Sequence, residues 1–198
     1  MENIYNEIRE LKREAIDKKI PIMVDDGIDF LTDFINNHPI ENILEIGTAI
    51  GYSAIMMALS APNLRITTIE KDPERYREAL KNIKKFGLEN RITLIYKDAL
   101  AVRTIEKFDL IFIDAAKGKN KDFFTKFEKN LNSNGYIITD NMSFHGYVHK
   151  DENEIESKNI RALVRKIKDY INFLDNNIRY KTRIYDIGDG IAVSEKRL

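Results

Sequence analysis

Short apolar segments alternate with amphipathic segments along the middle of the chain, and this alternation limits the folds that the chain can adopt. The apolar segments have the length and composition of β-strands and lie at residues 42–46, 65–69, 91–95, 108–113 and 135–139. Helical spacing of apolar residues occurs between them, at residues 52–60, 73–86 and 122–130. Strands joined by helices pair in parallel, so we expect a parallel sheet with helices on both faces.

Both ends of the chain add elements to this core. Further helices are expected at residues 2–19, 26–37 and 154–175, and further strands at 178–185 and 190–194. Only residues 186–190 separate the last two strands, which permits an antiparallel hairpin and excludes a parallel crossover. The sequence therefore predicts a Rossmann-like α/β fold with a seven-stranded, mostly parallel sheet and an antiparallel C-terminal edge hairpin. We expect a single domain over residues 1–198, with 1–40 as an N-terminal helical cap and 41–198 as the core.

The composition excludes several classes of protein. Lys and Arg together number 32, as do Asp and Glu, so no overall charge draws the chain to nucleic acid or to a membrane. The absence of Cys excludes disulfides and thiolate zinc sites. The sequence contains no apolar run of the roughly 18 residues that a membrane span needs, and its acidic, polar N-terminus is unlike a signal peptide. We therefore expect a cytoplasmic protein without a membrane partner.

Acidic residues stand at the ends of successive predicted strands, which is where open α/β sheets bind ligands. Glu45 precedes a turn with Gly47 and Gly51, whose spacing differs from the Gly-x-Gly-x-x-Gly of pyrophosphate-binding loops. A carboxylate there suits a cationic ligand such as S-adenosylmethionine (SAM) better than a phosphate. Glu70 could accept ribose hydroxyl protons, and Asp98 with Ala99 could recognise the adenine edge. A single acid at a strand end is more often a helix cap than a ligand contact, but together these acids predict a SAM-type site.

A second group of polar residues follows the two central strands. Asp114 ends one strand, and Asp140 with Asn141 ends the next. If these strands lie side by side, three oxygen ligands converge. Such a set suits Mg²⁺ best, and Mn²⁺ or Ca²⁺ are the next candidates. Helix caps and a turn would explain the same residues without a metal. Lys117 could act as a general base if a metal and burial lower its pKa, or it could be a solvated lysine in a basic run.

Three segments resemble the cation-dependent O-methyltransferases of the catechol and caffeoyl-CoA type. They are residues 45–53 (Glu-Ile-Gly-Thr-Ala-Ile-Gly-Tyr-Ser), 112–117 (Phe-Ile-Asp-Ala-Ala-Lys) and 138–141 (Ile-Thr-Asp-Asn). The resemblance implies a SAM-dependent methyltransferase fold, with Mg²⁺ on Asp114, Asp140 and Asn141 and with Lys117 as the base. It also implies that SAM is held by Met23, Gly47, Ser53, Glu70, Asp98, Ala99 and Asp114.

Within this family, the chain is most similar to the short bacterial enzymes that methylate 5-hydroxyuridine at the wobble position of tRNA anticodons. The similarity includes the post-metal segment 141–146 (Asn-Met-Ser-Phe-His-Gly) and the Gly-Asp-Gly of residues 188–190. A catechol and 5-hydroxyuridine both offer two adjacent oxygens to a metal. The resemblance thus implies tRNA methylation, with methylation of small catechol-like phenols as the alternative, and a homodimer, which is common in the family.

Basic residues offer a surface for the tRNA anticodon region. Lys158, Arg161, Arg165 and Lys168 are spaced to share one face of the predicted 154–175 helix. They could hold phosphates, or they could form a solvated face balanced by acids. Phe144 and Tyr147 could stack on a base or pack on the protein. His145 and His149 are expected at the surface, because they lie in a glycine-containing loop.

Overall fold

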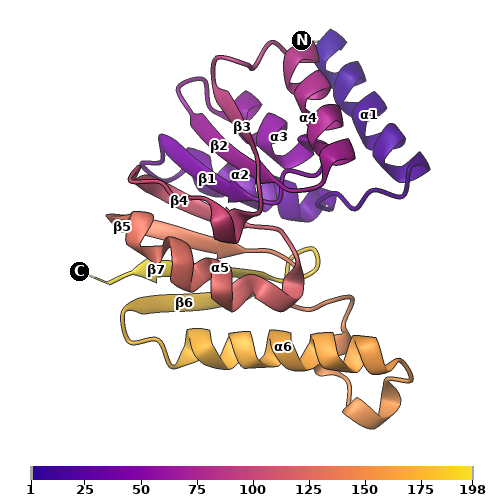
Figure 1. The fold of residues 1–198 in the computed structure, drawn as a ribbon, viewed down its shortest axis with the longest axis vertical. Helices are drawn as coiled ribbons and strands as arrows, with labels where there is room; N and C mark the ends of the chain where they lie inside the picture. Colours follow the sequence, from indigo (N-terminus) through magenta and orange to yellow (C-terminus); the bar gives the residue numbers. More distant parts are fainter. Residues whose placement is uncertain (1, 198) are drawn as a thin grey trace.

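The strands of the protein form one sheet. The computed structural model describes residues 2–197, and the side chains of Glu2, Asn3 and Lys117 lie outside the description. The described strands are β1 (Asn42–Ile46), β2 (Arg65–Glu70), β3 (Ile92–Tyr96), β4 (Phe108–Ile113), β5 (Leu131–Thr139), β6 (Tyr180–Tyr185) and β7 (Ile191–Lys196). Their order in the sheet is β3-β2-β1-β4-β5-β7-β6 (Figure 1). Pairing from β1 to β5 is parallel, whereas β7 is antiparallel to β5 and β6, so the predicted seven-stranded architecture is confirmed.

Helices cover both faces of this sheet, as predicted (Figure 1). They are α1 (Glu2–Asp17), α2 (Asp25–Asn36), α3 (Tyr52–Ser60), α4 (Pro73–Lys85), α5 (Asn120–Phe127) and α6 (Lys158–Asp175). Buried residues of α1 to α4 share one apolar cluster, while those of α5 and α6 share a second on the opposite face. No helix in the described part of the chain is both long and apolar enough to cross a bilayer.

Several predicted boundaries differ from the observed ones, and hydrogen bonds explain two of the differences. The fifth strand begins at Leu131 rather than at residue 135, although residues 132–134 are polar. The Asn132 amide donates a hydrogen bond of 2.7 Å to Asp109 on β4, and this long-range contact supports the early part of the strand. The long helix begins at Lys158 rather than at residue 154, because the Ser157 side chain caps it by accepting from the Ile160 N–H.

A buried pair of hydroxyls joins α6 to the strand that leads into the site. Tyr170 on α6 lies 2.8 Å from the hydroxyl of Thr139, the last residue of β5, and both side chains are buried. Burial raises the pKa of Tyr170 far above its ordinary value, so the phenol stays protonated and can donate. The contact fixes α6 against the end of β5.

We expect Tyr170→Phe to lower the free energy of unfolding by about 1–2 kcal/mol, because it leaves the Thr139 hydroxyl buried without this partner. Thr139→Val should cost a similar amount. The double variant should cost less than the sum, because it leaves neither hydroxyl behind. Urea denaturation of the four proteins measures this coupling, and strictly additive losses would contradict the assignment.

Candidate active site

Parallel pairing brings the ends of three central strands level with one another. Ile46 of β1 pairs with Ile113 of β4, and Ile113 pairs with Thr139 of β5. The hydrogen bonds continue one residue beyond the strands, because the Asp114 N–H donates to Ile46 O at 3.0 Å and the Asp140 N–H donates to Ile113 O at 3.1 Å. Asp114 and Asp140 therefore lie next to each other at the carboxyl edge of the sheet, in the side-by-side arrangement that the metal hypothesis requires.

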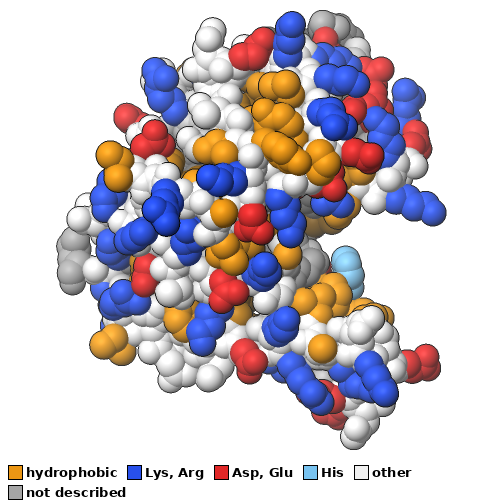
Figure 2. Space-filling model, in the orientation of Figure 1, with side chains coloured by type: hydrophobic (Ala, Val, Ile, Leu, Met, Phe, Trp, Pro, Cys, Tyr) orange, Lys and Arg blue, Asp and Glu red, His pale blue; other side chains and the backbone are white. Residues whose placement is uncertain are grey.

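A cavity of about 660 Å³ opens at this edge. Of the residues proposed for the cofactor and the metal, its lining contains Met23, Gly47, Glu70, Asp98, Ala99, Asp114, Asp140 and Asn141. The loop after β5 and the turn between β6 and β7 form another part of the wall, through Ser143, His145 and Asp189. Figure 2 shows the molecule hollowed on one side, between the part that contains α1 and the segment that projects at the N-terminal end of α6. The cavity has the size of a small-molecule site.

Gly47 has a conformation and a surrounding that no other residue type fits. Its φ is +101°, and a Cβ atom at this position would lie 2.1 Å from the carbonyl oxygen of Asp114. The glycine thus lets the loop after β1 approach the residue that follows β4.

Asp114, Asp140 and Asn141 form a compact polar group in the cavity. The Asn141 amide nitrogen lies 3.2 Å from Asp114 Oδ1 and 2.8 Å from Asp140 Oδ2. Asn141 has a φ of +64°, a left-handed conformation that Asn tolerates better than most residues. A half-turn of its amide would exchange nitrogen for oxygen and give the all-oxygen set that Mg²⁺ prefers. The group fits a divalent cation, although the described residues contain no cluster of three or more His, Cys, Asp or Glu placed for a metal.

Glu70 organises the opposite end of the cavity. One carboxylate oxygen accepts the N–H groups of Lys71 and Asp72, and the other accepts the N–H of Ala49, all at 2.9 Å. The side chain therefore ties the glycine loop after β1 to the turn that leads into α4. Each carboxylate oxygen can accept more than one hydrogen bond, so capacity remains for the hydroxyl groups of a ligand.

Glu45 and Ser53, both proposed as SAM ligands, lie behind the cavity wall rather than in its lining. Glu45 is fully buried and accepts hydrogen bonds of 2.5 Å from Ser53 and from Thr68. Burial raises the pKa of Glu45 to about 7, against the opposing effect of these two hydroxyl donors. The two residues support β1 and α3 from within, and their role as cofactor ligands stays a prediction.

The turn between β6 and β7 holds the loop that follows Asn141. The N–H groups of Met142 and Ser143 donate to the carbonyls of Gly190 and Asp189, at 2.9 and 2.8 Å. The Asp189 carboxylate also accepts the His145 N–H and lies 3.6 Å from the His145 ring. The His145 side chain is exposed, as expected, yet it borders the cavity. Sequence reasoning missed this contact because it joins residues that are far apart in the chain.

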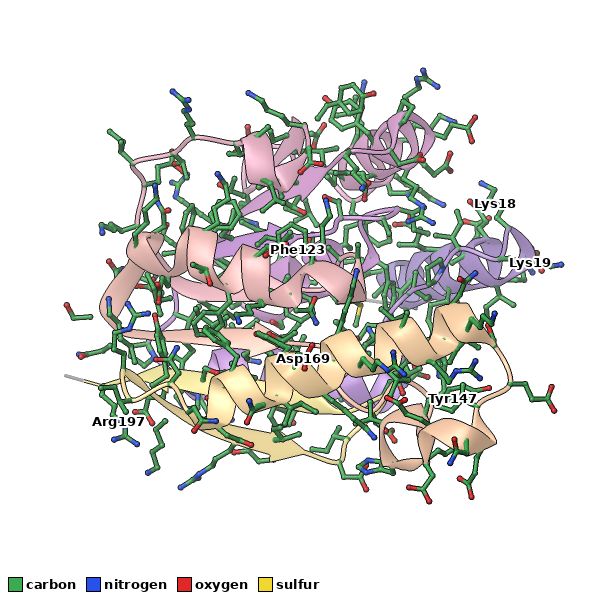
Figure 3. All side chains as sticks on the ribbon, turned by 60° about the horizontal axis from the view of Figure 1, so that its bottom comes forward. Lys18, Lys19, Phe123, Tyr147, Asp169 and Arg197 are labelled. Carbon is green, nitrogen blue, oxygen red and sulfur yellow. The ribbon has the colours of Figure 1, made fainter. Side chains whose placement is uncertain are left out.

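The four basic residues of α6 that were proposed to bind tRNA differ in their surroundings. Arg165 donates to both carboxylate oxygens of Glu152, at 2.7 and 2.6 Å. Arg161 donates to the carbonyls of Ile155 and Glu156, Lys168 lies 3.5 Å from the Lys150 carbonyl, and Lys158 is exposed. Figure 3 shows the segment with Tyr147 beside the N-terminal end of α6, so these contacts hold that segment against the helix. The proposed base Lys117 has its backbone in a short 3-10 turn, and its side chain lies outside the described residues.

Comparison with known proteins identifies the family. The family model of the O-methyltransferases matches residues 2–197, so the chain belongs to the O-methyltransferase family. The caffeoyl-CoA O-methyltransferase of Populus kitakamiensis is 28% identical over 97% of this chain and 87% of its own length. The catechol O-methyltransferase of Niastella koreensis is 37% identical over 59% of this chain and 55% of its own. The sequence-based prediction of an O-methyltransferase is confirmed.

Solved structures agree with this placement. A Staphylococcus aureus protein, solved as a candidate caffeoyl-CoA O-methyltransferase, is 35% identical, with a TM-score of 0.92 over 96% of this chain and 92% of its own. The O-methyltransferase of Bacillus cereus, solved in complex with SAH, has a TM-score of 0.83 over 97% of this chain and 91% of its own at 24% identity. At that identity the second likeness shows the fold, which is the predicted SAM-dependent methyltransferase fold.

Gly47→Ala should lower the free energy of unfolding by at least about 3 kcal/mol, because the new Cβ would overlap the Asp114 carbonyl. Gly87→Ala is the matched control. Gly87 also has a positive φ, +65°, but nothing lies within 4 Å of its Cβ position. The control should lose only about 1–2 kcal/mol from the left-handed backbone. Equal losses in urea denaturation would refute the steric explanation.

The buried Glu45 predicts a pH dependence of stability. Its pKa is about 7 in the folded chain and near 4.5 in the unfolded chain. Between pH 4.5 and pH 7, the chain therefore binds a proton when it folds. Stability is therefore lost as the pH rises through this range, by about 2 kcal/mol between pH 5 and pH 8. Glu45→Gln should remove most of this loss, whereas Glu89→Gln, at an exposed glutamate, should not. Denaturation at both pH values measures the difference, and equal slopes in all three proteins would contradict it.

Proposed function

We propose that the protein transfers the methyl group of SAM to a hydroxyl that stands beside a second oxygen, with 5-hydroxyuridine at the wobble position of tRNA as the acceptor. The observation that carries this proposal is the convergence of Asp114, Asp140 and Asn141 in the same cavity as Glu70 and Gly47. One end of the cavity offers a carboxylate beside a glycine loop, and the other offers a set of oxygen ligands. The arrangement suits a methyl donor next to a chelating acceptor.

The donor end supplies binding and orientation. Glu70 and Asp98 offer carboxylate oxygens for the ribose and adenine of SAM, and the glycine loop lets the backbone come close to the methionine portion. Met23 and Phe123 add apolar wall to the same cavity. Holding the methyl group in line with the attacking oxygen accounts for much of the acceleration in this kind of transfer.

The acceptor end orients the hydroxyl. Asp114, Asp140 and Asn141 would hold the divalent cation, which when bound favours the ionised form of a nearby hydroxyl. The clamped loop with Ser143 and His145 limits how an acceptor can enter. Lys117, three residues beyond Asp114, is the proposed base for the hydroxyl proton.

A small catechol is the second candidate acceptor. The observation that favours it is the likeness to proteins named as catechol and caffeoyl-CoA O-methyltransferases. A catechol and 5-hydroxyuridine present the same pair of adjacent oxygens, so the same residues would serve both. The tRNA proposal is supported by the resemblance of residues 141–146 and 188–190 to the tRNA-modifying branch. The proposed homodimer would let two chains share one tRNA.

The test is incubation of the purified protein with SAM, Mg²⁺ and tRNA that carries unmethylated 5-hydroxyuridine, followed by digestion and mass spectrometry. Formation of 5-methoxyuridine that a chelator abolishes, with little turnover of free catechol, is the expected result. Ready methylation of catechol without a tRNA product would overturn the tRNA acceptor and leave the small-phenol enzyme.

Asp140→Asn should lower kcat/KM in this assay by about 100-fold or more, because it removes one of two carboxylates from the proposed metal set. Asp169→Asn, at an exposed carboxylate on α6, makes the same chemical change away from the cavity and should keep full activity (Figure 3). A melting curve for each variant checks folding. Full activity in a folded Asp140→Asn protein would remove Asp140 from the metal set.

A further inference from the structure

The cavity carries opposite charges at its floor and at its rim. Its floor contains the carboxylates described above, which suit a cationic methyl donor and a divalent cation. Four cations also belong to the lining: Lys71, Arg75, Lys97 and Lys119. SAM has a sulfonium, an ammonium and one carboxylate, and it has no phosphate. The single carboxylate of SAM cannot engage all four cations, so the cations that remain suit a second ligand of negative charge.

These rim cations are available, unlike most of those on α6. None of the four forms a salt bridge with another described residue, whereas Arg165 and Arg161 are held by groups of their own chain. Two acids are sequence neighbours of these cations, Asp72 beside Lys71 and Asp98 beside Lys97. Asp72 accepts the N–H groups of Glu74 and Arg75, and Asp98 accepts the N–H of Leu100. A hydrogen bond from a backbone N–H leaves a carboxylate charged, so these two carboxylates offset part of the charge of the four cations and an excess of cations remains among these neighbouring residues.

Two tyrosines are sequence neighbours of two rim cations, and both lie outside the cavity lining. Tyr76 directly follows Arg75 on α4, and Tyr96 directly precedes Lys97 at the end of β3. Their ring centroids are 5.1 Å apart at an interplanar angle of 44°, and Tyr96 is 53% exposed. Proteins bind unstacked nucleotides by combining exposed aromatic rings, on which bases stack, with cations, which bind phosphates, and this segment of the surface offers both.

We propose that Lys71, Arg75, Lys97 and Lys119, together with Tyr76 and Tyr96, form the surface that binds single-stranded RNA next to the reacting nucleotide. The inference rests on the proposed function, and it moves the RNA contact from the face of α6 to the rim of the cavity. The nucleotide to be methylated enters the cavity, while a neighbouring nucleotide stacks on Tyr96 and nearby phosphates meet Arg75 and Lys97.

The test uses a synthetic anticodon stem-loop RNA with 5-hydroxyuridine at its wobble position, and free catechol as a neutral acceptor. The double variant Arg75→Gln with Lys97→Gln removes two rim charges. Arg77→Gln with Lys84→Gln is the matched control, because it removes one Arg and one Lys from exposed positions of α4 outside the cavity lining. KM and kcat for both acceptors are measured at saturating SAM over a series of salt concentrations.

The rim variant should raise KM for the RNA by about 10-fold relative to KM for catechol in the same protein. It should also reduce the magnitude of the slope of log(kcat/KM) against log[salt] by roughly 1.4, because each of the two lost phosphate contacts contributes about 0.7 on a single strand. The control pair should match the unmodified protein. Tyr96→Ala should raise KM for the RNA at least about 5-fold, and Tyr96→Phe should restore it, because stacking needs the ring and not the hydroxyl.

The outcomes distinguish a failure of the rim assignment from a failure of the proposed tRNA acceptor. If the unmodified protein methylates the RNA while the rim variant keeps its KM and salt slope, the rim assignment is wrong and the proposed function stands. If the control pair changes as much as the rim pair, the effect is general electrostatics and the assignment is also wrong. If the unmodified protein methylates only catechol, the tRNA acceptor fails and the rim assignment fails with it.

Discussion

The register between β1, β4 and β5 is the constraint on which the rest of the site depends. Ile46, Ile113 and Thr139 lie level across the sheet, so the next residue of each strand reaches the same edge. A slip of one residue in any of these pairs would turn every side chain of that strand to the opposite face. The apolar clusters on both faces exclude such a slip, and the same burial that stabilises the fold therefore also fixes the spacing of Asp114 and Asp140.

The sequence predicted those parts of the molecule that depend on local pattern. Periodicity and length were enough for the strands, the helices and the C-terminal hairpin, because each is encoded within one segment. The position of Asp114 and Asp140 followed from a single assumption, that β4 and β5 are neighbours, and the structure supports it. The residues at the strand ends were thus the part of the site that could be predicted from the sequence.

The remainder of the site depends on contacts between distant segments. Ser53 belongs to the same segment as Glu45, but the second partner of Glu45, Thr68, lies on another strand, so the burial of Glu45 behind the cavity wall does not follow from residues 42–53 alone. The engagement of Arg165 by Glu152 likewise needs the chain to fold back between β5 and α6. Equal numbers of acidic and basic residues gave no sign of charged regions, since a net charge of zero does not report how charges are distributed.

The hydrogen bonds between the loop after Asn141 and the turn before β7 have a consequence for the order in which the molecule is completed. Synthesis reaches the strand ends that carry Asp114 and Asp140 well before it reaches the acceptors at Asp189 and Gly190. A nascent chain in which this turn has not yet left the ribosome already contains the residues of the donor end of the cavity. It lacks the hydrogen-bond acceptors that hold the acceptor wall. The residues of the donor end are therefore synthesised before those that hold the acceptor wall, and this wall is complete only when the C-terminal hairpin has formed.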